Sequence, residues 1–112
     1  MSLDKLIEQD RELERAKIIG ETAQIPWREL QRFFAAGKVL WIAADLDLVE
    51  IAVAVQQDDV ARIEGLTGTG RIAPASDDQA RRWYEEDRLL WAVVVKPRVL
   101  VQEPAEDASE PD

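Results

Sequence analysis

Acidic residues gather at three places where the hydrophobic pattern of the chain is interrupted. Asp47 and Glu50 are three residues apart, whereas Asp58-Asp59 and Asp77-Asp78 are adjacent pairs. Carboxylates three residues apart on a helix can point the same way. Hard oxygen ligands at such spacing suit Mg²⁺ or Mn²⁺. The candidate residues for binding a small ligand or a divalent metal are therefore Asp47, Glu50, Asp58 and Asp59.

The same acids have a simpler interpretation as helix caps. An aspartate that precedes a helix accepts hydrogen bonds from the first backbone N–H groups, and Glu50 follows Asp47 at the spacing of a capping box. Negative charge also suits the positive end of the helix dipole. We favour the capping interpretation, because a shared metal site would require the separate acidic residues to converge in space.

The residues that most enzymes use are missing. The chain has no histidine and no cysteine, which excludes Ser-His-Asp triads, zinc-bound water and thiolate nucleophiles. The glycine-rich run at 65–70 closes a helix and lacks the Gly-Lys-Ser/Thr ending of a phosphate loop. Ser76 and Lys96 could form a Ser–Lys pair, but Ser76 is better explained as an N-cap. We expect neither catalysis nor a cofactor.

The four tryptophans offer a route to binding rather than to catalysis. Tryptophan brings a large apolar surface and is normally buried in the core. We expect this of Trp27, Trp41 and Trp91. Trp83, which stands beside Tyr84, is the tryptophan that we expect to be partly exposed and available to a partner.

Hydrophobic periodicity predicts the elements that carry these residues. We expect helices over 3–19, 26–36, 47–57, 58–66 and 77–86, and strands over 39–42, 71–73, 89–95 and 98–102. Residues 51–55 could also form a strand, although their flanks favour a helix. The fold class is α+β, with a small, mainly antiparallel sheet packed against four to five helices. Its last two strands should form the main part of the sheet and pair as an antiparallel hairpin, unless Pro97 only kinks a single strand.

Length and charge divide the chain into three parts. We expect a charged N-terminal helix over 1–20, one α+β core domain over 21–102 and a disordered acidic tail over 103–112. The tail holds five of the 23 acids and none of the 14 bases, so the net charge of −9 falls to −4 for residues 1–102. A nucleic-acid binder would show a basic patch instead. No signal-peptide core or membrane-spanning run is visible, which predicts a cytoplasmic protein without membrane contact.

Several motifs together resemble a family of small bacterial proteins, domain of unknown function 2288. These motifs are Ile25-Pro26-Trp27 with Glu29-Leu30, residues 46–50, residues 76–80 with Trp83, residues 90–95, and Pro97 with residues 99–102. The resemblance extends from about Glu21 to Gln102 and implies a bacterial, cytoplasmic setting, but no activity or catalytic residue. In that family an aromatic residue often follows the proline, so Arg98 departs from the pattern. We therefore add Arg98 to Trp83 and Tyr84 as the candidate interaction surface.

Three hypotheses about function remain. The first is a small protein-interaction or regulatory module without catalytic activity, whose partner is another protein or a second copy of the chain. Such a homodimer could form through an edge strand or the first helix. The second is a small-ligand or divalent-metal-binding protein that uses the clustered carboxylates. The least favoured is a nucleic-acid-associated factor with a winged-helix-like fold, because the charge has the wrong sign.

Overall fold

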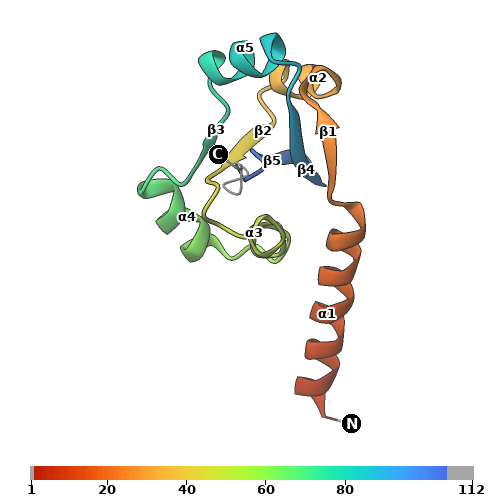
Figure 1. Cartoon of the computed structure of the whole chain (residues 1–112). Helices are drawn as coiled ribbons and strands as arrows, with labels where there is room; N and C mark the ends of the chain where they lie inside the picture. Colours follow the sequence, from red (N-terminus) through yellow and green to blue (C-terminus); the bar gives the residue numbers. More distant parts are fainter. Residues whose placement is uncertain (1, 106–112) are drawn as a thin grey trace, which may run out of the picture.

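The computed structural model describes residues 2–105 as five strands, five α-helices and one 3₁₀ turn (Figure 1). The helices are α1 (Leu3–Glu21), η1 (Trp27–Glu29, the 3₁₀ turn), α2 (Gln31–Ala35), α3 (Leu48–Gln56), α4 (Val60–Gly68) and α5 (Asp77–Glu85). The strands are β1 (Ala23–Pro26), β2 (Val39–Ile42), β3 (Ile72–Pro74), β4 (Leu89–Val95) and β5 (Arg98–Gln102). The fold class is α+β, as predicted. Residues 51–55 belong to helix α3.

All five strands form one sheet in the order β1-β4-β5-β2-β3. Every neighbouring pair is antiparallel except β5 and β2, which run parallel. The predicted hairpin of the last two strands is confirmed, with Val95 opposite Arg98. The last strand, β5, therefore lies in the middle of the sheet. Three consecutive residues of β5, Val99 to Val101, are buried because both faces of the sheet are covered there.

Two hydrophobic layers cover the two faces of the sheet. The aliphatic layer involves α1 and α3, and its buried members are Ile18, Ile42, Leu48, Ile51, Ala52, Ile72, Val93, Val95 and Leu100. The aromatic layer involves η1 and α5, and its buried members are Trp27, Leu30, Val39, Trp83, Leu90, Ala92, Val99 and Val101. Alternating residues of β4 supply both layers, since successive side chains of a strand point to opposite faces. Figure 1 shows α2 and α5 above the sheet and α3 and α4 below it.

The segment before Trp27 forms a strand, where we expected the start of a helix. Ala23 to Pro26 pairs with β4 in register from Ala92 to Leu89. Proline is tolerated there because β1 is an edge strand, whose last residue need not donate to the ladder. Helical structure begins only at Trp27 and is split between η1 and the five-residue α2. The prediction of one helix over 26–36 was wrong, although the apolar spacing that suggested it does mark an inward face.

Two of the expectations for tryptophan exposure were also wrong. The Trp83 side chain is completely buried and packs edge-on against Trp27, with 5.0 Å between ring centroids. Its neighbour Tyr84 takes the outward position on α5. Trp91 retains 37% of its surface exposed, although β4 is an interior strand. Sequence periodicity cannot show how far a helix extends along the face of a strand, so it could not find this opening.

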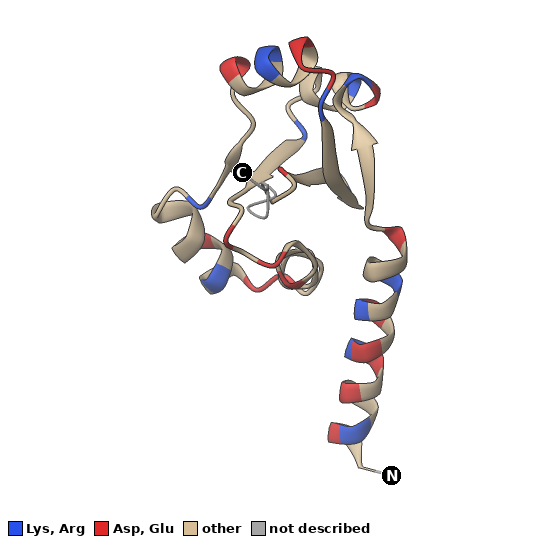
Figure 2. Ribbon diagram, viewed as in Figure 1, with Lys and Arg blue, Asp and Glu red and all other residues tan. Residues whose placement is uncertain are grey.

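Helix α1 reaches well beyond the rest of the molecule. Ile18 is its only buried residue, and Arg15 forms an ion pair with Glu50 of α3. The N-terminal half of α1 continues past the other elements, with charged residues spaced along it (Figures 1 and 2). The radius of gyration, 15.4 Å, exceeds the roughly 13 Å typical of a compact chain of this length. Among residues 2–105, no helix is long and apolar enough to cross a membrane.

Candidate functional site: an interaction surface

The acidic residues at the start of α3 are accounted for by local structure. Asp47 is the N-cap, and its Oδ1 accepts hydrogen bonds from the backbone N–H groups of Val49 at 3.0 Å and Glu50 at 3.3 Å. The Glu50 carboxylate pairs with Arg15 and so ties α1 to α3. Both side chains therefore hold helices in place, as the capping interpretation predicted for Asp47.

Asp58 and Asp59 lie at the opposite end of α3. Asp58 adopts a positive φ of 61° in the turn between the helices, and Asp59 caps α4 by accepting from the N–H of Arg62 at 3.4 Å. The nine residues of α3 separate these acids from Asp47 by roughly 13 Å along the helix axis, and Glu50 lies in the first turn, at the Asp47 end. Within residues 2–105, no group of three His, Cys, Asp or Glu residues could hold a metal ion. The structure does not bring the four candidate ligands together.

A small hollow beside α4 does unite three candidates that the sequence had assigned to different hypotheses. It has a volume of about 180 Å³ and is lined by Leu40, Val55, Asp58, Asp59, Val60, Ile63, Glu64 and Arg98. Arg98 reaches it from the start of β5, on the same face of the sheet as Leu100 two residues later. Small-molecule sites usually enclose about 300–1,000 Å³. The hollow is therefore too small for a typical cofactor.

Tyr84 lies elsewhere, on the aromatic side of the sheet. The guanidinium of Arg28 stacks over its ring, 4.4 Å from the centroid, and also donates a hydrogen bond to the Tyr84 carbonyl oxygen at 3.1 Å. Trp83 points inward from the same helix. The three predicted interaction residues thus lie apart: Trp83 is buried, Tyr84 is on the outer face of α5, and Arg98 lines the hollow beside α4. They do not form a common surface.

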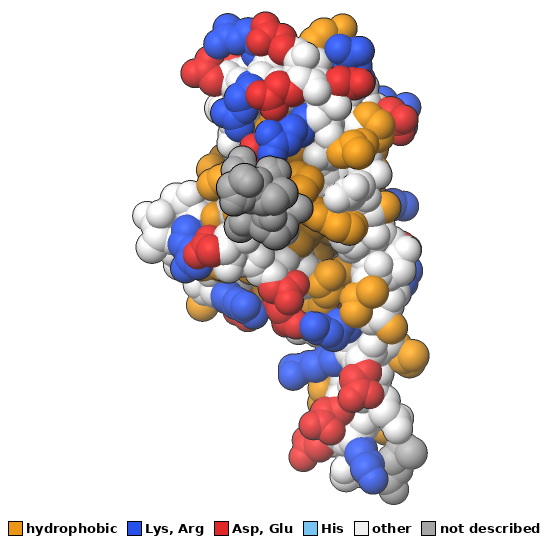
Figure 3. Space-filling model, viewed as in Figure 1, with side chains coloured by type: hydrophobic (Ala, Val, Ile, Leu, Met, Phe, Trp, Pro, Cys, Tyr) orange, Lys and Arg blue, Asp and Glu red, His pale blue; other side chains and the backbone are white. Residues whose placement is uncertain are grey.

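A more open apolar surface lies at the N-terminal end of α3, where that helix leaves part of β4 uncovered. On β4, the side chains of Leu89, Trp91 and Val93 point to the aliphatic face of the sheet. Of these, only Val93 is buried, beneath α3. A depression of about 280 Å³ beside the indole is lined by Thr22, Leu46, Asp47, Leu48, Val49, Trp91 and Gln102. We call these residues together with Leu89, which is 47% exposed, the Trp91 surface. Figure 3 shows hydrophobic side chains gathered over β4 and α3 on this side of the molecule.

The loop between β2 and α3 that borders this surface is held in place by the last residue of β5. The side-chain amide of Gln102 donates hydrogen bonds to the carbonyl oxygens of Ala43 at 2.9 Å and Leu46 at 2.7 Å. Asp45 in the same loop forms an ion pair with Arg71. The depression is thus preformed, since its wall is tied to the sheet rather than free to collapse onto Trp91.

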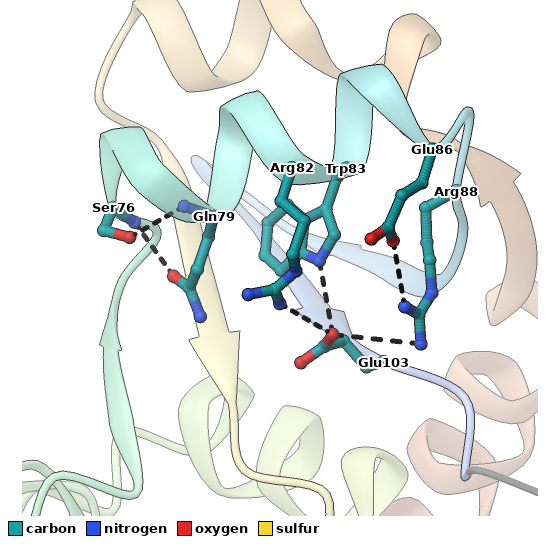
Figure 4. A network of polar contacts seen from close by, with 7 residues as sticks. All are labelled: Ser76, Gln79, Arg82, Trp83, Glu86, Arg88 and Glu103. Carbon is teal, nitrogen blue, oxygen red and sulfur yellow. Dashed lines mark hydrogen bonds and ion pairs between the residues drawn. The ribbon is translucent and has the colours of Figure 1, made fainter.

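The residue that follows β5 is anchored to α5 by a cluster of polar contacts (Figure 4). Oε2 of Glu103 accepts from the indole N–H of Trp83 at 3.3 Å and from the guanidinium of Arg82 at 3.1 Å. Arg88 lies 3.9 Å from the same oxygen. We had expected Glu103 to begin the disordered tail, and this expectation was wrong. Residues 104 and 105 of the predicted tail have no regular secondary structure, and residues 106–112 lie outside the described residues.

Comparisons with known proteins indicate a family and a similar fold but no function. A family model described as "Protein of unknown function (DUF2288)" matches residues 13–103. The match therefore includes the packed half of α1 and Glu103, which we had placed outside the resemblance. The solution NMR structure of PA1075 from Pseudomonas aeruginosa is 47% identical in sequence, with a TM-score of 0.74 over 83% of this chain and 86% of that one. No functionally curated protein is detectably similar.

Proposed function

The chain belongs to a family of proteins of unknown function, and from that premise we propose that it is a small cytoplasmic interaction module. It binds a segment of another protein through the Trp91 surface and carries out no catalysis. The observation that supports this proposal is the exposed Trp91 ring beside Leu89, at an end of the sheet that none of the described helices covers. Tryptophan is among the residues that contribute most to binding energy at protein interfaces.

The dimensions and charge of this surface favour a particular kind of partner. A depression of about 280 Å³ lies just below the usual range for small-molecule sites and can accept one or two apolar side chains. Asp47 lies on its border, and the chain as a whole has a net charge of −9. An incoming segment with an apolar anchor and flanking Lys or Arg would therefore be attracted to it.

The alternative hypotheses have no comparable support. The four carboxylates proposed for a metal or small ligand are divided between the two ends of α3, and most already cap or tether helices. A nucleic-acid factor would need a basic face, whereas the arginines of α5 and of the turn after it are paired with acids. We therefore carry forward the interaction module alone.

The proposal can be tested without knowing the natural partner. Peptides selected from a random phage-displayed library on the intact protein should share an apolar anchor next to basic residues. Their binding should weaken by about tenfold or more in Trp91→Ala, because removal of a central interface tryptophan commonly costs at least that much. Tyr84→Ala is the matched control, since it removes a similarly exposed aromatic ring from the other side of the sheet.

Amide chemical-shift changes would locate the bound peptide. We expect them in residues 46–49, around Trp91 and at Gln102. Peptides that bind Trp91→Ala as well as the original chain, or that perturb α5 instead, would contradict the proposal. Failure to select any peptide would contradict it as well.

A further inference from the structure

The N-terminal half of α1 exposes an apolar stripe that nothing in the described chain covers. Leu3 and Leu13 are each 70% exposed, Leu6 is 48% exposed and Ile7 is 43% exposed. None of these side chains belongs to either hydrophobic layer. Leu6 and Ile7 border an open cleft of about 620 Å³ whose opposite wall is formed by the polar residues Gln57 and Asp59. The stripe therefore has no apolar surface of its own domain to pack against.

The spacing of this stripe is that of a helix–helix seam. Leu3, Leu6, Asp10 and Leu13 follow one another at intervals of three, four and three residues, which is the repeat of positions a and d in a coiled coil. Helical segments shorter than about 12–15 residues are marginally stable alone in water. Residues 3–13 are all exposed, so this half of α1 gains little stability from packing on its own domain. A second helix against the seam would stabilise it.

We propose that two copies of the chain pair through the N-terminal halves of their α1 helices, in antiparallel orientation. Leu3 of one copy lies opposite Leu13 of the other, and Leu6 lies opposite Asp10. The overlap stops at residue 13, since Ile18 and the Arg15–Glu50 ion pair commit the rest of α1 to its own α3. This association is separate from the Trp91 surface and leaves it open in both copies.

Charge favours the antiparallel orientation over the parallel one. A parallel pair would place the two Asp10 carboxylates opposite each other in the seam. The antiparallel pair staggers them and sets each Asp10 beside a leucine instead. It also opposes the two helix dipoles and brings Glu14 next to the positively polarised start of the other α1. Ile7 then lies near the twofold axis, close to its own counterpart, and adds apolar contact.

The size of the contact sets the expected strength. Two helical segments of eleven residues bury less surface than the roughly 1,600 Å² of a standard protein interface, so the dimer should be weak and concentration-dependent. Each copy has a net charge of −9, and the two repel each other at low ionic strength. Added salt should therefore strengthen the association by screening that repulsion.

Disulfide crosslinking provides the decisive test, because the chain has no cysteine of its own. Leu3→Cys and Leu13→Cys would each be oxidised alone and as an equimolar mixture of the two full-length variants. We expect a covalent dimer in the mixture and little in either variant alone, since identical positions lie about ten residues apart in this register. Crosslinking of each variant with itself would indicate a parallel pair and overturn the proposal. No crosslinking in any sample would also overturn it.

Analytical ultracentrifugation of full-length variants supplies an independent readout. Leu13→Asp should raise the dimer dissociation constant by about tenfold or more, because it places an unpaired charge in the seam. Ile19→Asp is the matched control, since Ile19 is also exposed on α1 but lies on another side of the helix. Circular dichroism would confirm that both variants keep the fold. A chain that remains monomeric at millimolar concentration and in 0.5 M salt would contradict the proposal.

Discussion

The two faces of the sheet are covered in different ways. On the aromatic side, the rings of Trp27 and Trp83 are completely buried and Phe34 packs edge-on against Trp27 at 5.6 Å. A capping box of Ser76 and Gln79 fixes the start of α5, and Glu103 ties the chain beyond β5 to the same helix. On the aliphatic side, α3 leaves Trp91 partly open and α1 extends beyond the domain. The aromatic side is thus closed, whereas the aliphatic side is open and leaves apolar side chains exposed.

The closed, aromatic side contains a buried polar group that makes no hydrogen bond. Among the described residues, the indole N–H of Trp27 is the one buried side-chain polar atom without a hydrogen-bond partner. An unsatisfied buried donor costs about 1–3 kcal/mol. The Trp27 ring packs edge-on against the rings of Phe34 and Trp83. The packing of this layer must outweigh that cost.

The largest expected effect comes from replacing one tryptophan on each face of the sheet by alanine. Trp83→Ala should lower the free energy of unfolding by about 3–5 kcal/mol, because it opens a cavity among rigid rings. Trp91→Ala should cost at most about 2 kcal/mol, since part of its ring is already in water. Urea unfolding followed by circular dichroism measures both. Equal losses would mean that the Trp91 surface is covered in solution.

A second test replaces one buried valine of each hydrophobic layer by alanine. Val93 and Val99 are buried on adjacent central strands but face the aliphatic and aromatic layers respectively. Each Val→Ala substitution should cost about 2 kcal/mol, with Val99→Ala the more costly because rigid indoles cannot relax into the cavity as aliphatic chains can. The same urea unfolding experiment compares them. A larger loss in Val93→Ala would reverse our assignment of the more rigid side.

The smallest expected effect is a change in melting temperature on replacing one turn residue on each side of the sheet by glycine. Asp58 and Asp87 both adopt positive φ angles, of 61° and 50°, which favour glycine. Asp58→Gly should raise the melting temperature by about 2–3 °C, whereas Asp87→Gly should be nearly neutral because it also removes an exposed contact to Arg28. Differential scanning calorimetry resolves such shifts. A lower melting temperature for Asp58→Gly would reveal a stabilising contact of its side chain.

Much of the fold could be predicted from the sequence because local signals agree with the final packing. The β4–β5 hairpin and helix α3 have continuous apolar runs and clear caps, and both are where the pattern placed them. Strand β1 was missed because it has only four residues, ends in proline and depends on pairing with a strand more than sixty positions away. Such long-range pairing has no local signature.

The candidate site was harder to predict for the same reason. The capping role of Asp47 follows from local spacing, and the structure confirms it. The opening beside Trp91 depends instead on where α3 stops along the sheet, which no spacing rule expresses. The anchoring of Glu103 depends on Arg82 and Trp83, about twenty residues earlier. A single acid after a strand gives no signal of such a contact.

The central position of β5 has a consequence for how the protein is made. Within residues 2–105 this strand is the last regular element, yet it pairs with both β4 and β2 and joins the two halves of the sheet. A nascent chain that ends before residue 98 would have two separate strand pairs with exposed apolar edges. The sheet therefore cannot be completed until residues 98–102 have been synthesised. Until then, the exposed edges of the two strand pairs are open to pairing with other chains.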